Sequence, residues 1–139
     1  MIRTVVALLL LGSLALPSLA RPKQPTSLVD SRYVSALATA NDFLHAWQIQ
    51  DQETGTLLLT DQLKQRTNEE ILNAFFSSTA RPQSFEIGRG KKLRPGRYRF
   101  PVSLFPRPAK TGSRWTRPRT SALIVVKAGK SDWAIDKLP

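Results

Sequence analysis

Lys and Arg are the most abundant chemically functional residues in the second half of the chain. Between Arg81 and Arg119 there are twelve Lys and Arg residues and one acid, Glu86, so this segment carries +11, as does the whole chain. Guanidinium and ammonium groups bind phosphates, sulfates and carboxylates. The alternative is a solvated face that keeps the protein soluble. The sequence predicts a patch for an anionic partner, formed by Arg89, Lys91, Lys92, Arg94, Arg97, Arg99, Arg114, Arg117 and Arg119.

Residues suited to catalysis are few. The 139 residues include one histidine, His45, and no cysteine. A metal site needs several His, Cys or carboxylate ligands, and nucleophilic catalysis needs a base beside the nucleophile. His45 and Asp42 are three residues apart, which indicates a pair on a helix surface rather than a metal site. We therefore predict no catalytic residue, no metal ligand and no cofactor.

A strand pair over residues 85–105 must position the basic patch. In its second strand Tyr98 and Phe100 alternate with Arg97 and Arg99, so apolar and basic side chains fall on opposite faces. Pro95-Gly96 is a tight-turn dipeptide and separates the two strands. The second strand also contains a proline, Pro101, which cannot donate to a ladder and predicts an edge position or a bulge.

Two further strands are expected, at 121–127 and 132–138. The first contains a continuous apolar run, which is typical of a central strand buried on both faces. Between the second and third strands, residues 106–118 hold three prolines and predict a long loop or the frayed tip of a hairpin.

Helical periodicity precedes the strands. Apolar residues at three- and four-residue spacing predict a helix from about residue 30 to residue 50. A shorter helix is expected at 56–66, with Asp51 as a cap rather than a base. Thr67 and Glu70 form a capping-box pattern and predict a third helix from Asn68. The fold class predicted is α+β, with three N-terminal helices packed on a curved antiparallel sheet of about four strands.

The first twenty residues have the pattern of a signal peptide. Arg3 precedes an apolar run over 5–16, and Ser18-Leu19-Ala20 fits the cleavage site. The alternative is an uncleaved membrane anchor. We predict a signal peptide at 1–20, a flexible linker at 21–29, and one domain at 30–139 without a transmembrane segment. The protein would be exported, periplasmic or secreted, and without cysteine its fold would depend on packing alone.

Two segments carry a family resemblance. FLHAWQIQD at 43–51 and DWAIDKLP at 132–139 resemble framework features of the nuclear transport factor 2-like superfamily, which includes small exported bacterial domains of unknown function. The chain departs from that family because it shows no strand or hairpin between its second and third helices. The resemblance implies a cone-shaped domain with a ligand pocket between helix and sheet, which we expect Tyr33, Trp47, Phe85, Tyr98 and Trp133 to line.

Fold alone does not select a function in such a family. We predict a non-catalytic binding or interaction domain, which could bind an anionic polymer, a lipid headgroup or an acidic protein through the basic sheet region. Nucleic acid is not the expected partner, because the chain is predicted to be exported. The alternative is a cofactor-free isomerase or hydrolyase acting on a small apolar ligand in the pocket. Homodimerisation through the open sheet face is a further expectation.

Overall fold

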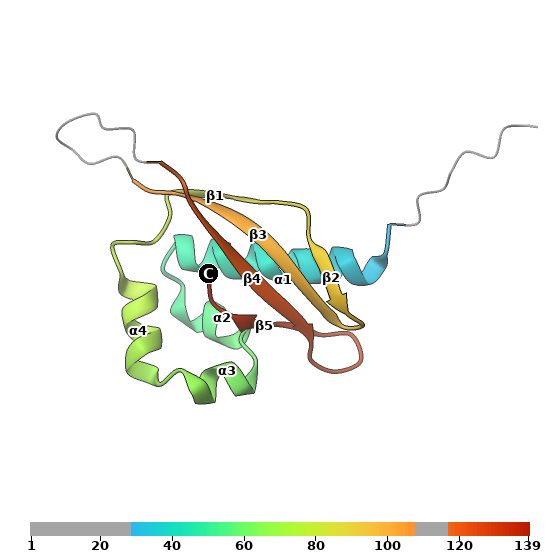
Figure 1. The fold of residues 1–139 in the computed structure, drawn as a ribbon. Coiled ribbons are helices and arrows are strands. Elements are labelled where there is room, and N and C mark those ends of the chain that lie inside the picture. Colours follow the sequence, from blue (N-terminus) through green and yellow to red (C-terminus); the bar gives the residue numbers. More distant parts are fainter. Residues whose placement is uncertain (1–28, 108–116) are drawn as a thin grey trace, which may run out of the picture.

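The structure, a computed structural model, describes residues 29–107 and 117–139 (Figure 1). The predicted signal peptide, and all of the predicted linker except Val29, lie outside the described residues. The helices come first in the chain, and the strands follow. The helices are α1 (Ser31–Gln48), α2 (Gln52–Leu57), α3 (Asp61–Arg66) and α4 (Glu69–Ser77), and the strands are β1 (Ser84–Ile87), β2 (Lys91–Arg94), β3 (Arg97–Phe105), β4 (Arg119–Lys127) and β5 (Trp133–Lys137). The α+β class is confirmed.

Helix α1 forms the layer that covers the sheet. Asp30 caps its N-terminus, because the Asp30 side chain accepts a hydrogen bond of 3.0 Å from the backbone N–H of Arg32. Its buried positions fall on one face, as the apolar spacing predicts. Those buried residues are Ala36, Ala40, Phe43, Leu44, Ala46 and Trp47.

The helix predicted at 56–66 is wrong, because the chain forms two short helices there. Asp51 caps α2, as predicted, and Thr60 caps α3. Between them Leu59 pairs with Ile135 in a parallel bridge. The backbone N–H of Ile135 donates to the Leu58 carbonyl at 2.7 Å, and the Thr60 N–H donates to the Ile135 carbonyl at 2.9 Å. Hydrogen bonding to the sheet edge thus replaces one helical turn.

Helix α4 begins one residue later than predicted. Its N-cap is Asn68, whose side chain accepts a 2.8 Å hydrogen bond from the Ile71 N–H. The expected Thr67 cap is therefore wrong. Asn and Thr are both good N-caps, and the pattern T-N-x-E offered both at adjacent positions.

The sheet is antiparallel, with the order β1-β3-β4-β5, and β2 also pairs with β3. It has five strands rather than four, because Gly88–Gly90 divides the first predicted strand into β1 and β2. Pro101 lies on an inner strand, opposite this break, and its carbonyl accepts from the Gly88 N–H at 2.8 Å. The missing N–H of Pro101 points to the same side as its carbonyl, so it faces the break and interrupts no strand ladder.

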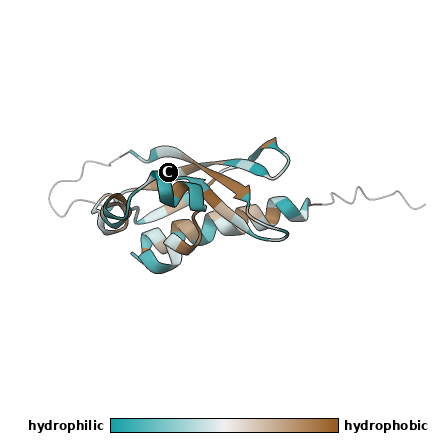
Figure 2. Ribbon diagram, turned by 90° about the horizontal axis from the view of Figure 1, so that it is seen from below, coloured by the Kyte–Doolittle hydropathy of each residue, from teal (hydrophilic) through white to brown (hydrophobic). Residues whose placement is uncertain are grey.

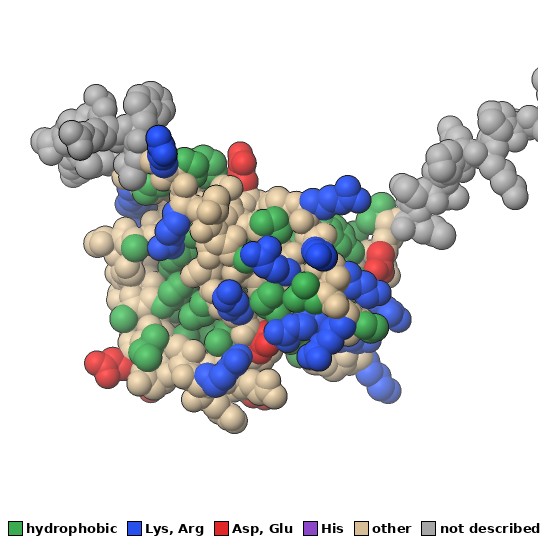
Figure 3. All heavy atoms as spheres, in the orientation of Figure 1, with side chains coloured by type: hydrophobic (Ala, Val, Ile, Leu, Met, Phe, Trp, Pro, Cys, Tyr) green, Lys and Arg blue, Asp and Glu red, His purple; other side chains and the backbone are tan. Residues whose placement is uncertain are grey.

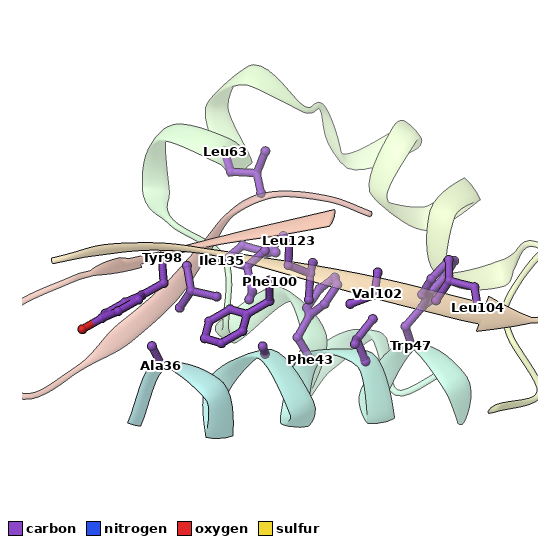
Figure 4. Close-up of a cluster of buried hydrophobic side chains, with 14 of the residues drawn as sticks. Ala36, Phe43, Trp47, Leu63, Tyr98, Phe100, Val102, Leu104, Leu123 and Ile135 are labelled. Atoms are coloured by element: carbon purple, nitrogen blue, oxygen red, sulfur yellow. The ribbon is translucent and has the colours of Figure 1, made fainter. Parts of the chain in front are cut away.

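The core lies between α1 and the sheet (Figure 2). Alternate side chains of β3 point toward α1, and Tyr98, Phe100, Val102 and Leu104 are 0–3 % exposed (Figure 4). The intervening residues Arg97 and Arg99 therefore lie on the outer face, as the alternation predicts. Strand β4 is internal, as predicted, and four consecutive residues from Ala122 to Val125 are buried.

Candidate functional site

The β2–β3 hairpin brings four predicted patch residues together on the outer face. Its turn contains Pro95 and Gly96, and Gly96 has a φ of 75°, a left-handed conformation that glycine adopts easily. Lys91 lies opposite Arg99, and Arg94 lies opposite Arg97. Residues directly opposite in an antiparallel pair share a face, so Lys91 lies on the outer face with Arg99. A register shift between Lys92 and Arg94 brings Arg94 opposite Arg97, and both residues line one groove on that side. We call Lys91, Arg94, Arg97 and Arg99 the hairpin patch.

Both of these cross-strand pairs are like-charged. Like charges directly opposite each other destabilise a strand pair, typically by about 0.2–1 kcal/mol. Lys91, Arg94 and Arg99 are exposed, and within the described part of the chain none of them has an acidic side chain within ion-pair distance. Lys and Arg side chains gather over this end of the sheet (Figure 3). The hairpin therefore concentrates positive charge at a cost to its own stability.

Arg97 differs from the other three because a carboxylate holds it. Its Nη1 donates to Asp136 Oδ2 at 3.0 Å, and the side chains of Arg97 and Asp136 are 28 % and 10 % exposed. Asp136 Oδ1 accepts from Thr60 Oγ1 at 3.0 Å and from Arg66 Nη2 at 3.3 Å. Asp136 thus connects β3, β5 and α3 on the outer face.

The remaining patch predictions separate into three groups. Lys92 lies opposite Tyr98 and so belongs to the inner face of the hairpin, while Arg89 is exposed in the break between β1 and β2. Arg117 and Arg119 are exposed at the far end of the sheet. Arg119 pairs with Leu104, which is five residues along β3 from Arg99, or roughly 17 Å. Arg114 lies outside the described residues.

Within the described residues, the five predicted pocket residues lie in three separate places. Tyr33, Tyr98 and Trp133 meet at one end of the core, where Tyr98 lies 5.7 Å from the Tyr33 ring and 5.6 Å from the Trp133 ring. Trp47 stacks on Phe75 at 4.5 Å and donates from Nε1 to the Phe75 carbonyl at 3.1 Å. Tyr98 and Trp47 are buried in the core, whereas Tyr33 and Trp133 are half-buried at its edge. Trp133 also lines a groove of about 690 Å³ beside α3.

Phe85, the fifth predicted pocket residue, lies on a separate surface groove between α1 and β1. That groove has a volume of about 450 Å³ and is also lined by Val34, Leu37, Ala38, Asn41 and Ile87. The lining is apolar apart from one amide. Phe85 is therefore separated from the ring cluster around Tyr98 rather than joined to it in one pocket.

Tyr98 and Asp30 fasten the start of α1 to β3. The Tyr98 hydroxyl donates to Asp30 Oδ2 at 2.9 Å. This hydrogen bond, followed by that from the Arg32 N–H, holds the pKa of Asp30 below its ordinary 3.8, and the charge of Lys92 adds to the effect. Burial, followed by the hydrogen bond to Asp30, raises the pKa of Tyr98 above its ordinary 10.0.

These two shifts give stability a pH dependence at both extremes. The Asp30 contribution is complete above its unfolded pKa near 3.8 and is lost as the pH falls through the lower folded value. The Tyr98 contribution is complete below 10.0 and is lost as the pH rises through the higher folded value. Urea unfolding of Asp30→Asn should lack the acid loss, and Tyr98→Phe should lack the alkaline loss. Wild-type slopes in both variants would contradict the assignment.

Sequence reasoning missed three cations near the hairpin patch. Arg32, Arg66 and Lys127 come from α1, α3 and β4, and nothing in their local sequence marks them. Arg66 reaches the site through Asp136, while Arg32 and Lys127 line a groove beside Arg94 and Arg97. Only the strand register and the position of α3 relative to β5 bring these residues together.

Other chemistries find little support in the described residues. Asp42 and His45 are both exposed on α1. Among residues 29–107 and 117–139, no three His, Asp or Glu side chains gather closely enough to hold a metal ion, and no charged side chain is buried. The helices of this described part include none with the length and apolar character that a membrane crossing requires.

No protein-family model, curated protein or solved structure matches the chain. The resemblance to the nuclear transport factor 2-like superfamily therefore stays a prediction.

Proposed function

We propose that the protein is an exported, non-catalytic binding domain that binds an anionic polymer through the outer face of its β2–β3 hairpin. The observation that carries the proposal is the pair of like-charged cross-strand positions, Lys91 with Arg99 and Arg94 with Arg97. The proposal of export is supported by the signal-peptide pattern of residues 1–20. The proposal of an anionic polymer is supported by the positive charge of the hairpin patch.

An anionic partner would offset the repulsion within the like-charged pairs. Negative groups placed between the opposed cations convert a repulsion into two attractions, so binding recovers the stability that the free hairpin lacks. The exposed groups Lys91, Arg94 and Arg99 supply the contacts, and a 3.0 Å hydrogen bond to Asp136 holds the Arg97 guanidinium group. A repeating polyanion suits a row of cations on adjacent strands better than a single small anion does.

The absence of a catalytic role is supported by the surroundings of the polar groups. The one titratable tyrosine with a shifted pKa, Tyr98, donates to a helix-capping aspartate. Asp136 is occupied by three donors. His45 is exposed and so is not a desolvated base.

Binding of heparin to the mature chain, residues 21–139, tests the proposal. Affinity should be measured by calorimetry at a series of salt concentrations. Three phosphate-like contacts predict that log affinity falls linearly with log salt, with a slope of magnitude about 2 to 3. Vesicles containing anionic lipid and polyglutamate form the comparison set. No heparin binding at low salt would contradict the proposal, and binding to vesicles alone would assign the patch to a membrane surface instead.

A further inference from the structure

A groove lies beside the hairpin patch, where two β-turns meet the start of α3. Its volume is about 680 Å³, within the range of sites for small ligands. The lining comes from the N-termini of α1 and α3, the β2–β3 turn with the strand ends beside it, the end of β4 with the turn after it, and β5. It consists of Arg32, Thr60, Asp61, Gln62, Arg94, Pro95, Gly96, Arg97, Val126, Lys127, Ala128 and Asp136.

The two sides of this groove have different chemistry. The cations Arg32, Arg94, Arg97 and Lys127 come from α1, β2, β3 and β4, whereas Thr60, Asp61 and Gln62 lie at the N-terminus of α3. Asp136 joins the two sides, because Thr60 Oγ1 and Arg97 Nη1 each donate to its carboxylate at 3.0 Å. A ligand that spans the groove therefore meets positive donors on one side and mainly acceptors on the other.

Arg97 is prepared for an anion. A guanidinium group has five N–H donors, and the contact with Asp136 uses the Nη1 end. The side chain is 28 % exposed, which leaves part of it accessible from the groove. Because Asp136 already fixes its orientation, Arg97 loses little rotational freedom when it binds an oxyanion.

The carboxylates restrict the class of ligand. The Asp61 side chain is 93 % exposed and repels a ligand that is anionic throughout, but it accepts hydrogen bonds from hydroxyl groups. No aromatic side chain lines the groove, so a nucleobase has nothing on which to stack. The apolar lining is limited to Pro95, Val126 and Ala128, which is little surface for an acyl chain.

We infer that this groove binds one phosphorylated or sulfated sugar unit. The tetrahedral oxyanion lies against Arg94 and Arg97, and the sugar hydroxyls lie against Asp61 and Gln62. The inference rests on the proposed function, because Arg94 and Arg97 belong to both sites, and it identifies the anionic polymer as a polysaccharide.

Nuclear magnetic resonance titration of the ¹⁵N-labelled mature chain tests this inference. Glucose 6-phosphate and glucose 6-sulfate are the probes. Glucose, which lacks the oxyanion, and inorganic phosphate, which lacks the sugar, are the controls. We expect shifts of the Gln62, Gly96 and Lys127 amides, with at least about tenfold tighter binding of a sugar ester than of inorganic phosphate. The phosphate and sulfate arms show which oxyanion is preferred.

Variants separate the groove from the rest of the hairpin patch. Arg94→Gln and Gln62→Ala should each weaken binding of the sugar ester, whereas Arg99→Gln, which does not line the groove, should leave it unchanged. Equal affinity for inorganic phosphate and the sugar esters would overturn the sugar assignment. If the mature chain binds heparin but the sugar esters shift no amide of the groove, this inference alone is overturned. If the mature chain does not bind heparin either, the proposed function is overturned as well.

Discussion

Replacing Lys91, Arg94 and Arg99 together by Glu is expected to weaken heparin binding about 100-fold or more at low salt. The three residues are exposed on one face, so reversal turns three attractions into three repulsions without removing a packed side chain. Arg97 is left in place because its contact with Asp136 supports the fold. Calorimetric titration with heparin gives the affinity, and a smaller salt slope should accompany its loss.

The matched control is Arg107→Glu/Arg117→Glu/Arg119→Glu. These exposed residues flank the β3–β4 connection at the far end of the sheet, and the substitutions change the net charge equally. This variant should retain most of the affinity. Equal losses in the two variants would show that net charge, rather than the hairpin patch, determines binding.

Asp136→Asn is expected to lower the free energy of unfolding by about 2 kcal/mol, since hydrogen bonds to charged groups are worth about 1.5–3 kcal/mol. Most of the effect should come from Arg97 and Thr60, because the Arg66 side chain is 61 % exposed and its ion pair is well solvated. For a domain of this size the loss corresponds to a melting temperature lower by roughly 10 °C. Urea and thermal unfolding provide the measurement.

Asp61→Asn is the control for this substitution. Asp61 lies 3.8 Å from Lys64 Nζ, and its side chain is 93 % exposed, so its removal should change stability by less than about 0.5 kcal/mol. Similar stability for the two variants would show that the contacts of Asp136 contribute little to stability.

The alternation of β3 made its part of the fold predictable. Period-two spacing identified both the buried ring of Tyr98 and the outward side chains of Arg97 and Arg99, and Pro95-Gly96 placed the turn. Local chemistry controls these features. The division between α2 and α3 was not predictable, because it depends on two hydrogen bonds to a residue far along the chain: the Ile135 N–H donates to the Leu58 carbonyl, and the Thr60 N–H donates to the Ile135 carbonyl.

The sequence predicted which cations could form the patch, but not how they are arranged on the sheet. Sequence composition indicated nine cations, but the register alone shows that Lys91 lies opposite Arg99 whereas Lys92 lies on the inner face. The contributions of Arg32 and Lys127 to the groove depend on where two turns and a helix start converge. Tyr98, an inward ring that the sequence predicted for a pocket, is 3 % exposed and packs beside the rings of Tyr33 and Trp133.

In the free protein, the cations that bind the anion also repel one another and so lower the stability of the hairpin. Lys91→Glu tests this relation most directly. This change places Glu opposite Arg99, so a like-charged pair becomes an opposite-charged pair. Lys91→Gln, which removes the charge without reversing it, is the control. The measurement is the melting temperature of each protein with and without heparin.

We predict that Lys91→Glu melts about 2–4 °C above wild type without heparin, that Lys91→Gln lies between them, and that heparin stabilises wild type more than either variant. A melting temperature at or below that of wild type, together with undiminished stabilisation by heparin, would contradict the account.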